Sequence, residues 1–188
     1  MKKSKVLDII EWGILTVLLS VIINNHFLSY ANFSPMEAHK QSERTSYYGP
    51  SEIIKEIDLD GYKIYLCRYK EWFSANTVIK RGFMWYPGSG TGGRKIKENE
   101  KVTFTWSSSK VDDDRRMMRI AGYVRDPQIS AMELRVKEGD NIISLKYSID
   151  ESRMFIYYWN EFEKDYKPFI LIGYDNKGNK IYESDMFE

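Results

Sequence analysis

Cysteine is almost absent from this chain of 188 residues, because Cys67 is the only one. An intrachain disulfide is therefore excluded. Secreted eukaryotic domains of this size often carry several disulfides, whereas many exported proteins of low-disulfide bacteria carry none. Cys67 stands in the apolar run of residues 64–67, which predicts a buried and inert thiol.

Histidine is also scarce. His26 falls in the apolar N-terminal segment, which leaves His39 alone for the rest of the chain. A Ser-His-Asp system or a multi-histidine zinc site is therefore not expected. Carboxylate pairs such as Glu161 and Glu163 are interpreted as surface acids, and we expect neither catalysis nor a cofactor.

Two loops resemble ligand sites only in composition. The glycine-rich stretch 88–94 is followed by Lys95 and Ile96, whereas a phosphate loop needs Lys followed by Ser or Thr at a helix start. The run Asp112–Asp114 lacks the alternating acids and glycine of a calcium loop. Arg115 and Arg116 follow it at once. We interpret these as an inter-strand loop and a self-neutralised surface loop, with no metal.

The chain has no excess of either charge, with 28 Lys and Arg against 27 Asp and Glu. Residues 1–31 contain three lysines and two acids, so residues 32–188 balance at 25 of each sign. Nucleic-acid binders normally carry a basic excess because phosphate contacts supply their affinity. No nucleic-acid partner is expected.

The N-terminal segment combines Lys2, Lys3 and Lys5 with a mostly apolar run from Trp12 to Ile23. In a first interpretation it is a signal anchor. From Trp12 to Tyr30 a helix would extend about 27 Å, close to the thickness of the hydrocarbon core. The two aromatic residues would lie at the interfaces and the lysines would stay in the cytoplasm.

A second interpretation is a cleaved signal peptide, because Ser29 and Ala31 offer small residues at the −3 and −1 positions. Residues 1–31 are thus predicted to be a signal anchor, or a signal peptide cleaved near Ala31. Both place the rest of the chain outside the cytoplasm. A buried core helix of a cytoplasmic protein is a third, less favoured interpretation.

Residues 32–50 are predicted to form a short helix and a linker. Ser34, Pro35 and Glu37 have the spacing of a capping box with proline in the first helical position. The helix is expected to run to about Glu43, and the linker ends at Gly49-Pro50.

Residues 51–97 are predicted to form a small β-meander. Aromatic residues make up 15 % of the chain, which favours strands. The apolar runs 53–59 and 62–68 are joined by Asp60-Gly61, a strong hairpin signal. Residues 77–80 and 83–86 are further strand candidates.

Residues 98–188 are predicted to form an antiparallel β-sandwich of the immunoglobulin type. Short strand candidates follow one another at the spacing typical of such folds; they begin at residues 102–106 and continue at 117–124, 131–137, 142–148, 154–159, 169–174 and 180–183. The strand 169–174 is apolar on both faces. We therefore expect it to be central and covered on both sides, or covered at one end by the meander.

Two stretches resemble bacterial immunoglobulin-like domains. The first is residues 120–129 followed by 132–136, with Gly122, Val124 and Asp126 in a Gly-x-Val-x-Asp pattern, and the second is the closing stretch 173–180. The whole layout is similar to uncharacterised membrane-anchored or exported proteins of Bacillus-like bacteria that carry a C-terminal immunoglobulin-like β-sandwich. The resemblance implies a fold and a location. It assigns no activity to any residue.

Aromatic side chains are the candidate ligand-binding residues. Trp106 and Trp159 are expected in the core, whereas Trp72-Phe73 and Trp85-Tyr86 are the candidate binding residues. The favoured function is a non-catalytic extracytoplasmic binding or interaction module anchored at a bacterial membrane, with an envelope protein or glycan as partner. The alternatives are a carboxylate-based hydrolase of envelope polymers and a structural subunit of a membrane complex.

Overall fold

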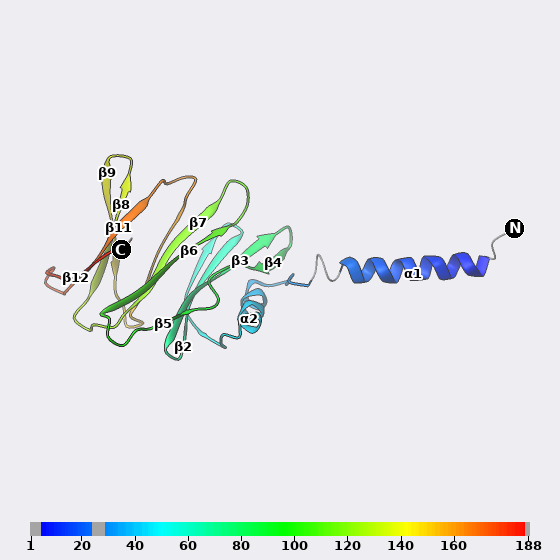
Figure 1. Ribbon diagram of the computed structural model, residues 1–188, viewed down its shortest axis with the longest axis horizontal. Helices are drawn as coiled ribbons and strands as arrows, with labels where there is room; N and C mark the ends of the chain where they lie inside the picture. Colours follow the sequence, from blue (N-terminus) through cyan, green and yellow to red (C-terminus); the bar gives the residue numbers. More distant parts are fainter. Residues whose placement is uncertain (1–4, 24–28, 187–188) are drawn as a thin grey trace.

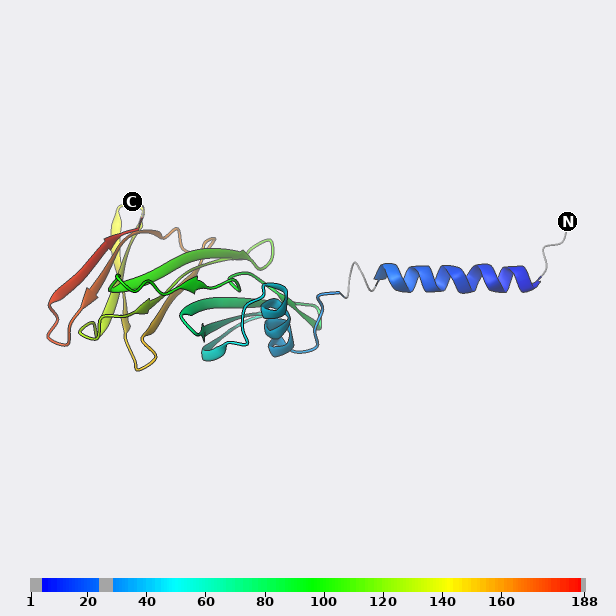
Figure 2. The same cartoon turned by 60° about the horizontal axis from the view of Figure 1, so that its bottom comes forward.

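A computed structural model describes residues 5–23 and 29–186 of the chain. The protein is mainly β, as predicted, with antiparallel sheets and two helices in the described part. Helix α1 (Lys5–Ile23) lies apart from the β-sheets, whereas α2 (Pro35–Thr45) packs against them (Figures 1 and 2).

Sheet A is built by the predicted meander. Its main strands pair in the order β1-β2-β3-β4, and β5 also pairs with β3. Asp60-Gly61 forms the predicted hairpin turn, and the φ of +65° at Gly61 is one that glycine adopts at little cost. The strands are β1 (Glu52–Leu59), β2 (Tyr62–Tyr69), β3 (Trp72–Arg81), β4 (Met84–Pro87) and β5 (Arg94–Lys95).

Helix α2 covers one face of sheet A. The predicted cap is present, because Ser34 Oγ accepts a hydrogen bond from the Glu37 N–H (3.2 Å). Ala38 packs against Tyr65, Cys67 and Val78. Cys67 is fully buried, as predicted, and burial raises the pKa of its thiol to about 12, so the thiol stays protonated.

The C-terminal half forms two further sheets. Sheet B has the strand order β10-β7-β6 and sheet C the order β12-β11-β8-β9, with antiparallel pairing throughout. The predicted final hairpin is present as β11–β12. The strands are β6 (Val102–Lys110), β7 (Arg116–Val124), β8 (Ala131–Glu138), β9 (Asn141–Ser148), β10 (Met154–Asn160), β11 (Lys167–Tyr174) and β12 (Lys180–Asp185).

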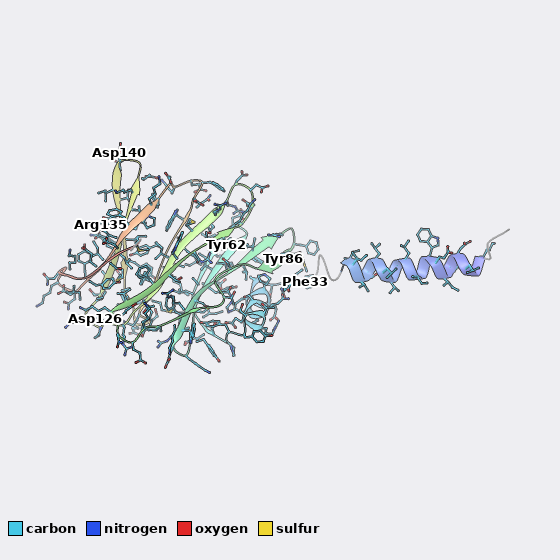
Figure 3. The ribbon with its side chains drawn as sticks, viewed as in Figure 1. Phe33, Tyr62, Tyr86, Asp126, Arg135 and Asp140 are labelled. Atoms are coloured by element: carbon cyan, nitrogen blue, oxygen red, sulfur yellow. The ribbon has the colours of Figure 1, made fainter. Side chains whose placement is uncertain are left out.

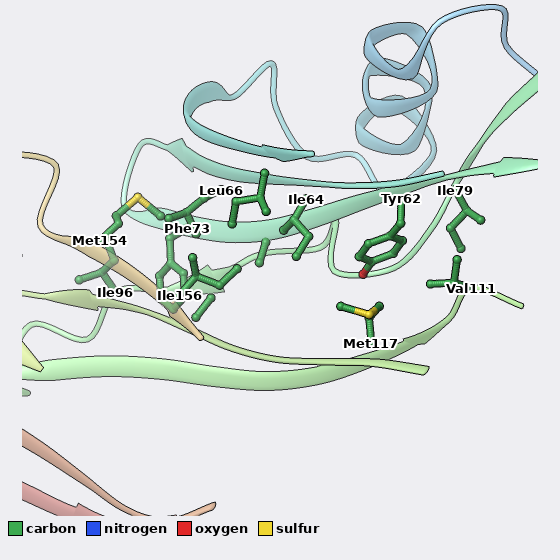
Figure 4. Close-up of a cluster of buried hydrophobic side chains, with 13 residues drawn as sticks. Tyr62, Ile64, Leu66, Phe73, Ile79, Ile96, Val111, Met117, Met154 and Ile156 are labelled. Atoms are coloured by element: carbon green, nitrogen blue, oxygen red, sulfur yellow. The ribbon is translucent and has the colours of Figure 1, made fainter. Parts of the chain in front are cut away.

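Sheet B lies between the other two sheets and contributes to two hydrophobic cores. Ile156 of β10 points into the core shared with sheet A, together with Tyr62 and Phe73 (Figure 4). Its neighbour Phe155 points into the core shared with sheet C, together with Leu171. We call these the A–B core and the B–C core. The layers therefore run α2, sheet A, sheet B, sheet C.

This layering corrects the expectation for the strand 169–174. It is an inner strand of sheet C, as predicted, and Leu171 enters the B–C core. The meander does not supply its second cover, because sheet A packs on sheet B. Ile172 is nevertheless buried, in a register position opposite Glu133 and Glu183.

Between Leu7 and Ile23, the large apolar side chains of α1 are exposed around its circumference. In the ranges that the structure describes, no helix has the combined length and apolarity needed to cross a membrane. The span predicted from the sequence, Trp12–Tyr30, includes residues 24–28, which lie outside the described residues.

Candidate functional site

The candidate site is a groove between two strand edges. Strand β6 is the last strand of sheet B and β12 the last strand of sheet C. A cleft of about 690 Å³ separates them, which we call the edge groove. It is lined by Arg94, Lys97, Glu100, Lys101, Val102, Phe104, Thr105 and Trp106 on one side, and by Tyr182, Ser184, Asp185 and Met186 on the other.

Most charges at the edge groove are neutralised locally. Lys97 Nζ lies 2.5 Å from a Glu100 carboxylate oxygen, and Lys101 Nζ lies 3.2 Å from Asp126. The Gln128 backbone N–H and then Lys101 lower the pKa of Asp126, which keeps it ionised as the partner of Lys101. The cleft is therefore polar but nearly neutral.

Trp106 is exposed, and the expectation that it lies in the core is wrong. Its side chain is 60 % exposed, whereas Trp159 is buried as predicted. The alternation of β6 is correct, because Val102 and Phe104 both pack in the B–C core. Trp106 stands on the same face two residues further along, where it borders two cavities instead of packing in the B–C core.

Behind Trp106 lies a small apolar cavity of about 160 Å³, which we call the tryptophan cavity. The ring centroids of Trp159 and Tyr166, which both line this cavity, lie 6.0 Å apart, and the two ring planes are tilted by 48°. The cavity shares Trp106 and Met186 with the edge groove. Its complete lining is Trp106, Met118, Ile120, Trp159, Tyr166, Lys167, Pro168 and Met186.

The indole N–H of Trp159 is buried and has no hydrogen-bond acceptor among the described residues. A buried donor left unpaired costs about 1–3 kcal/mol. Apart from Lys167, the side chains that line the tryptophan cavity are apolar or aromatic. The cavity therefore suits a ligand that places an apolar side chain among these residues and a carbonyl oxygen within reach of the Trp159 N–H.

The β6 edge is well suited to pairing with another strand. From Val102 to Ser109 it has no charged side chain, although charges are a common protection of exposed edges. At one end of this run Ser108 O accepts a hydrogen bond from Ser89 Oγ (3.2 Å). The rest of the edge can offer main-chain N–H and C=O groups to an extended peptide, and adjacent pockets select its side chains. The edge groove therefore combines a strand edge, an exposed tryptophan and a side-chain pocket.

The four binding residues predicted from the sequence do not form one site. Trp72 and Phe73 are the first two residues of strand β3, where alternation turns them to opposite faces. Phe73 is fully buried in the A–B core, and Trp85 packs beside the core under α2. Trp85 of β4 pairs with Lys80 of β3. Lys80 lies eight residues from Trp72 along β3, which is about 26 Å at the rise of a strand, so Trp85 and Trp72 lie at opposite ends of β3.

A buried polar cluster fastens α2 to sheet A. Asn76 donates to His39 Nδ1 and to Ser42 Oγ, and its Oδ1 accepts from Thr91 Oγ1 (2.9 Å). On its other side His39 Nε2 lies 3.5 Å from Glu43. All five side chains are buried. Although it combines histidine, carboxylate and hydroxyl groups, the cluster is closed to a substrate, so we interpret it as structural.

The glycine-rich stretch folds back on β3. Gly88 N donates to Thr77 O (2.8 Å), and Ser89 Oγ accepts from Arg119 Nη2 (2.7 Å). Gly90 has a φ of +91°, and a Cβ there would lie 2.2 Å from Ala75 O and 2.9 Å from Arg119 Nη2. Glycine is required here by close backbone approach, and the stretch is an inter-strand loop, as predicted.

The acidic run is also a surface loop, as predicted. Asp112 lies 2.6 Å from Arg115, and Lys110 lies 2.8 Å from Asp113. Hydrogen bonding to Arg115 lowers the pKa of Asp112. Within residues 5–23 and 29–186, no group of His, Cys, Asp and Glu side chains is arranged to hold a metal ion.

No family model, curated protein or solved structure matches this chain. The site is therefore defined by its own geometry. The sequence signal for it was an uncharged run of alternating Thr, aromatic and Ser residues in the predicted strand that begins at residue 102.

Proposed function

We propose that this chain is a non-catalytic extracytoplasmic binding module held at a bacterial membrane by its N-terminal segment, and that its ligand is an extended segment of an envelope protein. The segment pairs with the β6 edge and places an apolar side chain in the tryptophan cavity. The observation that carries the proposal is Trp106, exposed on an uncharged strand edge between a cleft and an apolar cavity.

We further propose that residues 98–188 form an immunoglobulin-like sandwich. Numbered in chain order, their first, second and fifth strands share sheet B, and the third, sixth and seventh share sheet C. This is the distribution of strands A, B, E and C, F, G in immunoglobulin domains. The fourth strand, β9, joins the second group beside β8. In this fold the first and last strands border an open side, where the edge groove lies.

Retention of the N-terminal segment is supported by contacts on both sides of Ala31. Gln41 Nε2 donates to Ser29 O (2.9 Å), and Asn32 pairs with Trp85 through two main-chain hydrogen bonds. Cleavage after Ala31 would remove the first of these contacts. The lysines Lys2, Lys3 and Lys5 in the first five residues of the sequence support a cytoplasmic N-terminus and an external β-domain.

The hydrolase alternative has weaker support. Glu100, one of two carboxylates lining the edge groove, is paired with Lys97, and Asp185 comes from the opposite strand β12. A glycan could stack on Trp106. As the ligand of the edge groove, a protein strand is favoured over a glycan, because two strand edges flank this cleft and the apolar tryptophan cavity adjoins it.

Peptide selection on the full chain in lipid nanodiscs tests this function. A phage-displayed library of short random peptides is expected to yield sequences with alternating apolar residues. Trp106→Ala should weaken their binding about thirtyfold or more, because a buried tryptophan anchor commonly supplies about 2 kcal/mol or more. Affinity is measured by surface plasmon resonance.

The matched control is Trp72→Ala, which removes a partly exposed tryptophan on sheet A. It should leave peptide affinity unchanged. Selected peptides that bind the Trp106→Ala chain as well as the unmodified one would refute the proposed site. Enrichment of no sequence at all would refute peptide binding by this groove.

A further inference from the structure

Exposed aromatic rings gather at the end of the β-domain nearest α1. Phe33 is 84 % exposed and lies at this end, and the β3–β4 turn that carries Phe83 lies there as well (Figures 1 and 3). Phe83 is 77 % exposed. Large apolar side chains exposed together mark a surface that contacts something other than water.

The two segments that carry these phenylalanines are joined by main-chain pairing. Asn32 N donates to Trp85 O (2.8 Å) and Trp85 N donates to Asn32 O (2.7 Å). Phe33 follows Asn32 directly, and Phe83 precedes Trp85 by two residues. The chain that leaves α1 is thus fastened beside the β3–β4 turn instead of forming a free tether.

The reach of the chain keeps this surface near the membrane. Six residue steps separate Ile23, the last residue of α1, from Ser29, whose carbonyl accepts from Gln41. A fully extended chain spans at most about 3.3–3.6 Å per residue, so this link covers about 22 Å at most. If the span instead ends at Tyr30, Asn32 and Trp85 lie directly at the lipid surface.

The charges beside the rings are complementary to anionic lipid. Lys80 and Arg81 lie over the rings of Trp85 and Tyr86, at 6.0 and 5.7 Å, without an ion pair to a carboxylate of the described residues. The two acids that line the same pocket as Lys80 and Arg81 are compensated, since Arg115 pairs with Asp112 and Lys110 with Asp113. Basic side chains near an anionic surface add favourable attraction.

We propose that this end of the β-domain docks on the surface of the bilayer that holds α1, with Phe33 and Phe83 in the headgroup region and Lys80 and Arg81 on lipid phosphates. This inference rests on the membrane attachment proposed above and is independent of the edge groove. Aromatic rings favour the membrane interface because one part of that region is apolar and the other wet.

Spin labels on single introduced cysteines test the docking, because the natural Cys67 is fully buried. The full chain carrying Phe83→Cys is labelled and reconstituted in phosphatidylcholine vesicles with phosphatidylglycerol. We expect the label to collide more with membrane-soluble oxygen than with a water-soluble nickel complex. Lys80→Ala with Arg81→Ala should shift the ratio toward nickel, and the unmodified chain serves as the labelling blank.

The matched control is Ile142→Cys, an exposed apolar position (63 %) beside the β8–β9 turn, where Asp140 marks the far side of the domain (Figure 3). Its label should favour nickel. The same accessibility at positions 83 and 142 would overturn the docking, and so would a label at 83 that is shielded from both probes by protein.

A third label, at Leu18→Cys in α1, separates the two proposals. If this label lies in the hydrocarbon while position 83 is aqueous, docking is wrong and the membrane attachment stands. If the label at position 18 is aqueous, the attachment itself fails and the docking fails with it.

Discussion

At the scale of single residues, Arg119 carries its charge between sheets A and B, and it forms no ion pair with a carboxylate of residues 5–23 and 29–186. It is 1 % exposed. Its Nη1 donates to Tyr62 Oη (3.0 Å) and Ser109 Oγ (2.7 Å), and its Nη2 donates to Ser89 Oγ. Burial lowers the pKa of Arg119. The neutral oxygens replace water at Nη1 and Nη2, whereas the buried Nε has no acceptor among the described residues. One side chain thus joins β2, β6 and the glycine-rich loop.

Arg119→Lys is expected to destabilise the protein although it preserves the charge. An ammonium group lacks the planar fork that serves several acceptors at once, and each lost charged hydrogen bond costs about 1.5–3 kcal/mol. The free energy of unfolding is measured by urea titration in detergent. Arg125→Lys, at an exposed position, is the control and should change stability by less than about 0.5 kcal/mol. Equal losses in both variants would contradict this role of Arg119.

His39 makes the stability of the protein depend on pH. Burial lowers its pKa, Glu43 opposes that shift and Lys40 adds to it. Because Asn76 donates to His39 Nδ1, protonation of this nitrogen also requires the amide of Asn76 to turn. The contribution of His39 to stability should be complete above about pH 6.5 and fall as the pH drops below it, since the unfolded chain takes up the proton first.

His39→Gln tests this dependence because glutamine offers an acceptor and does not titrate. Unfolding free energies of both chains are measured between neutral pH and about pH 5. The unmodified chain should lose stability on acidification more steeply than the variant. Parallel pH profiles would show that the dependence originates elsewhere.

At the scale of elements, the sequence predicted strands where turn residues and alternation agree. Asp60-Gly61, Gly139 and Asn176–Asn179 separate runs that form β1–β2, β8–β9 and β11–β12. The cap at Ser34 was equally clear, because its hydrogen bond is local. Local chemistry therefore determined most boundaries.

Strand β6 shows why the candidate site could not be predicted in the same way. Alternation predicted that Trp106 shares a face with Val102 and Phe104, which is correct. It could not predict where the opposite sheet ends, because that depends on how β12, some 75 residues later, is placed. The same limitation applies to Phe73, which only the packing of sheet A on sheet B buries.

At the scale of the whole molecule, sheet B joins the two cores. Neighbouring residues of β10 and of β7 point alternately into the A–B core and the B–C core. A substitution that weakens the packing of one core also destabilises β7 and β10, on which the other core depends. Sheet A, residues 52–95, and sheets B and C, residues 102–185, are therefore expected to unfold together.

Phe155→Ala and Ile156→Ala test this with adjacent positions that face opposite cores. The expected losses are about 3–5 and 2–5 kcal/mol. Calorimetry of the full chain in detergent should show one common transition, lowered by either substitution. Two transitions, each shifted by only one of the variants, would indicate that the sheets unfold independently.

The central position of sheet B also determines when the protein can complete its folding during synthesis. The last long strand of sheet A, β3, has been synthesised once the ribosome has passed Arg81. The A–B core is complete only after Met154 and Ile156 of β10 have also been synthesised. About 70 residues separate these points, which at 5–20 residues per second is roughly 4–15 s of elongation. Through that interval the apolar face formed by Tyr62, Ile64, Leu66 and Phe73 has no cover from β10, so the nascent chain needs protection against aggregation until its C-terminal strands arrive.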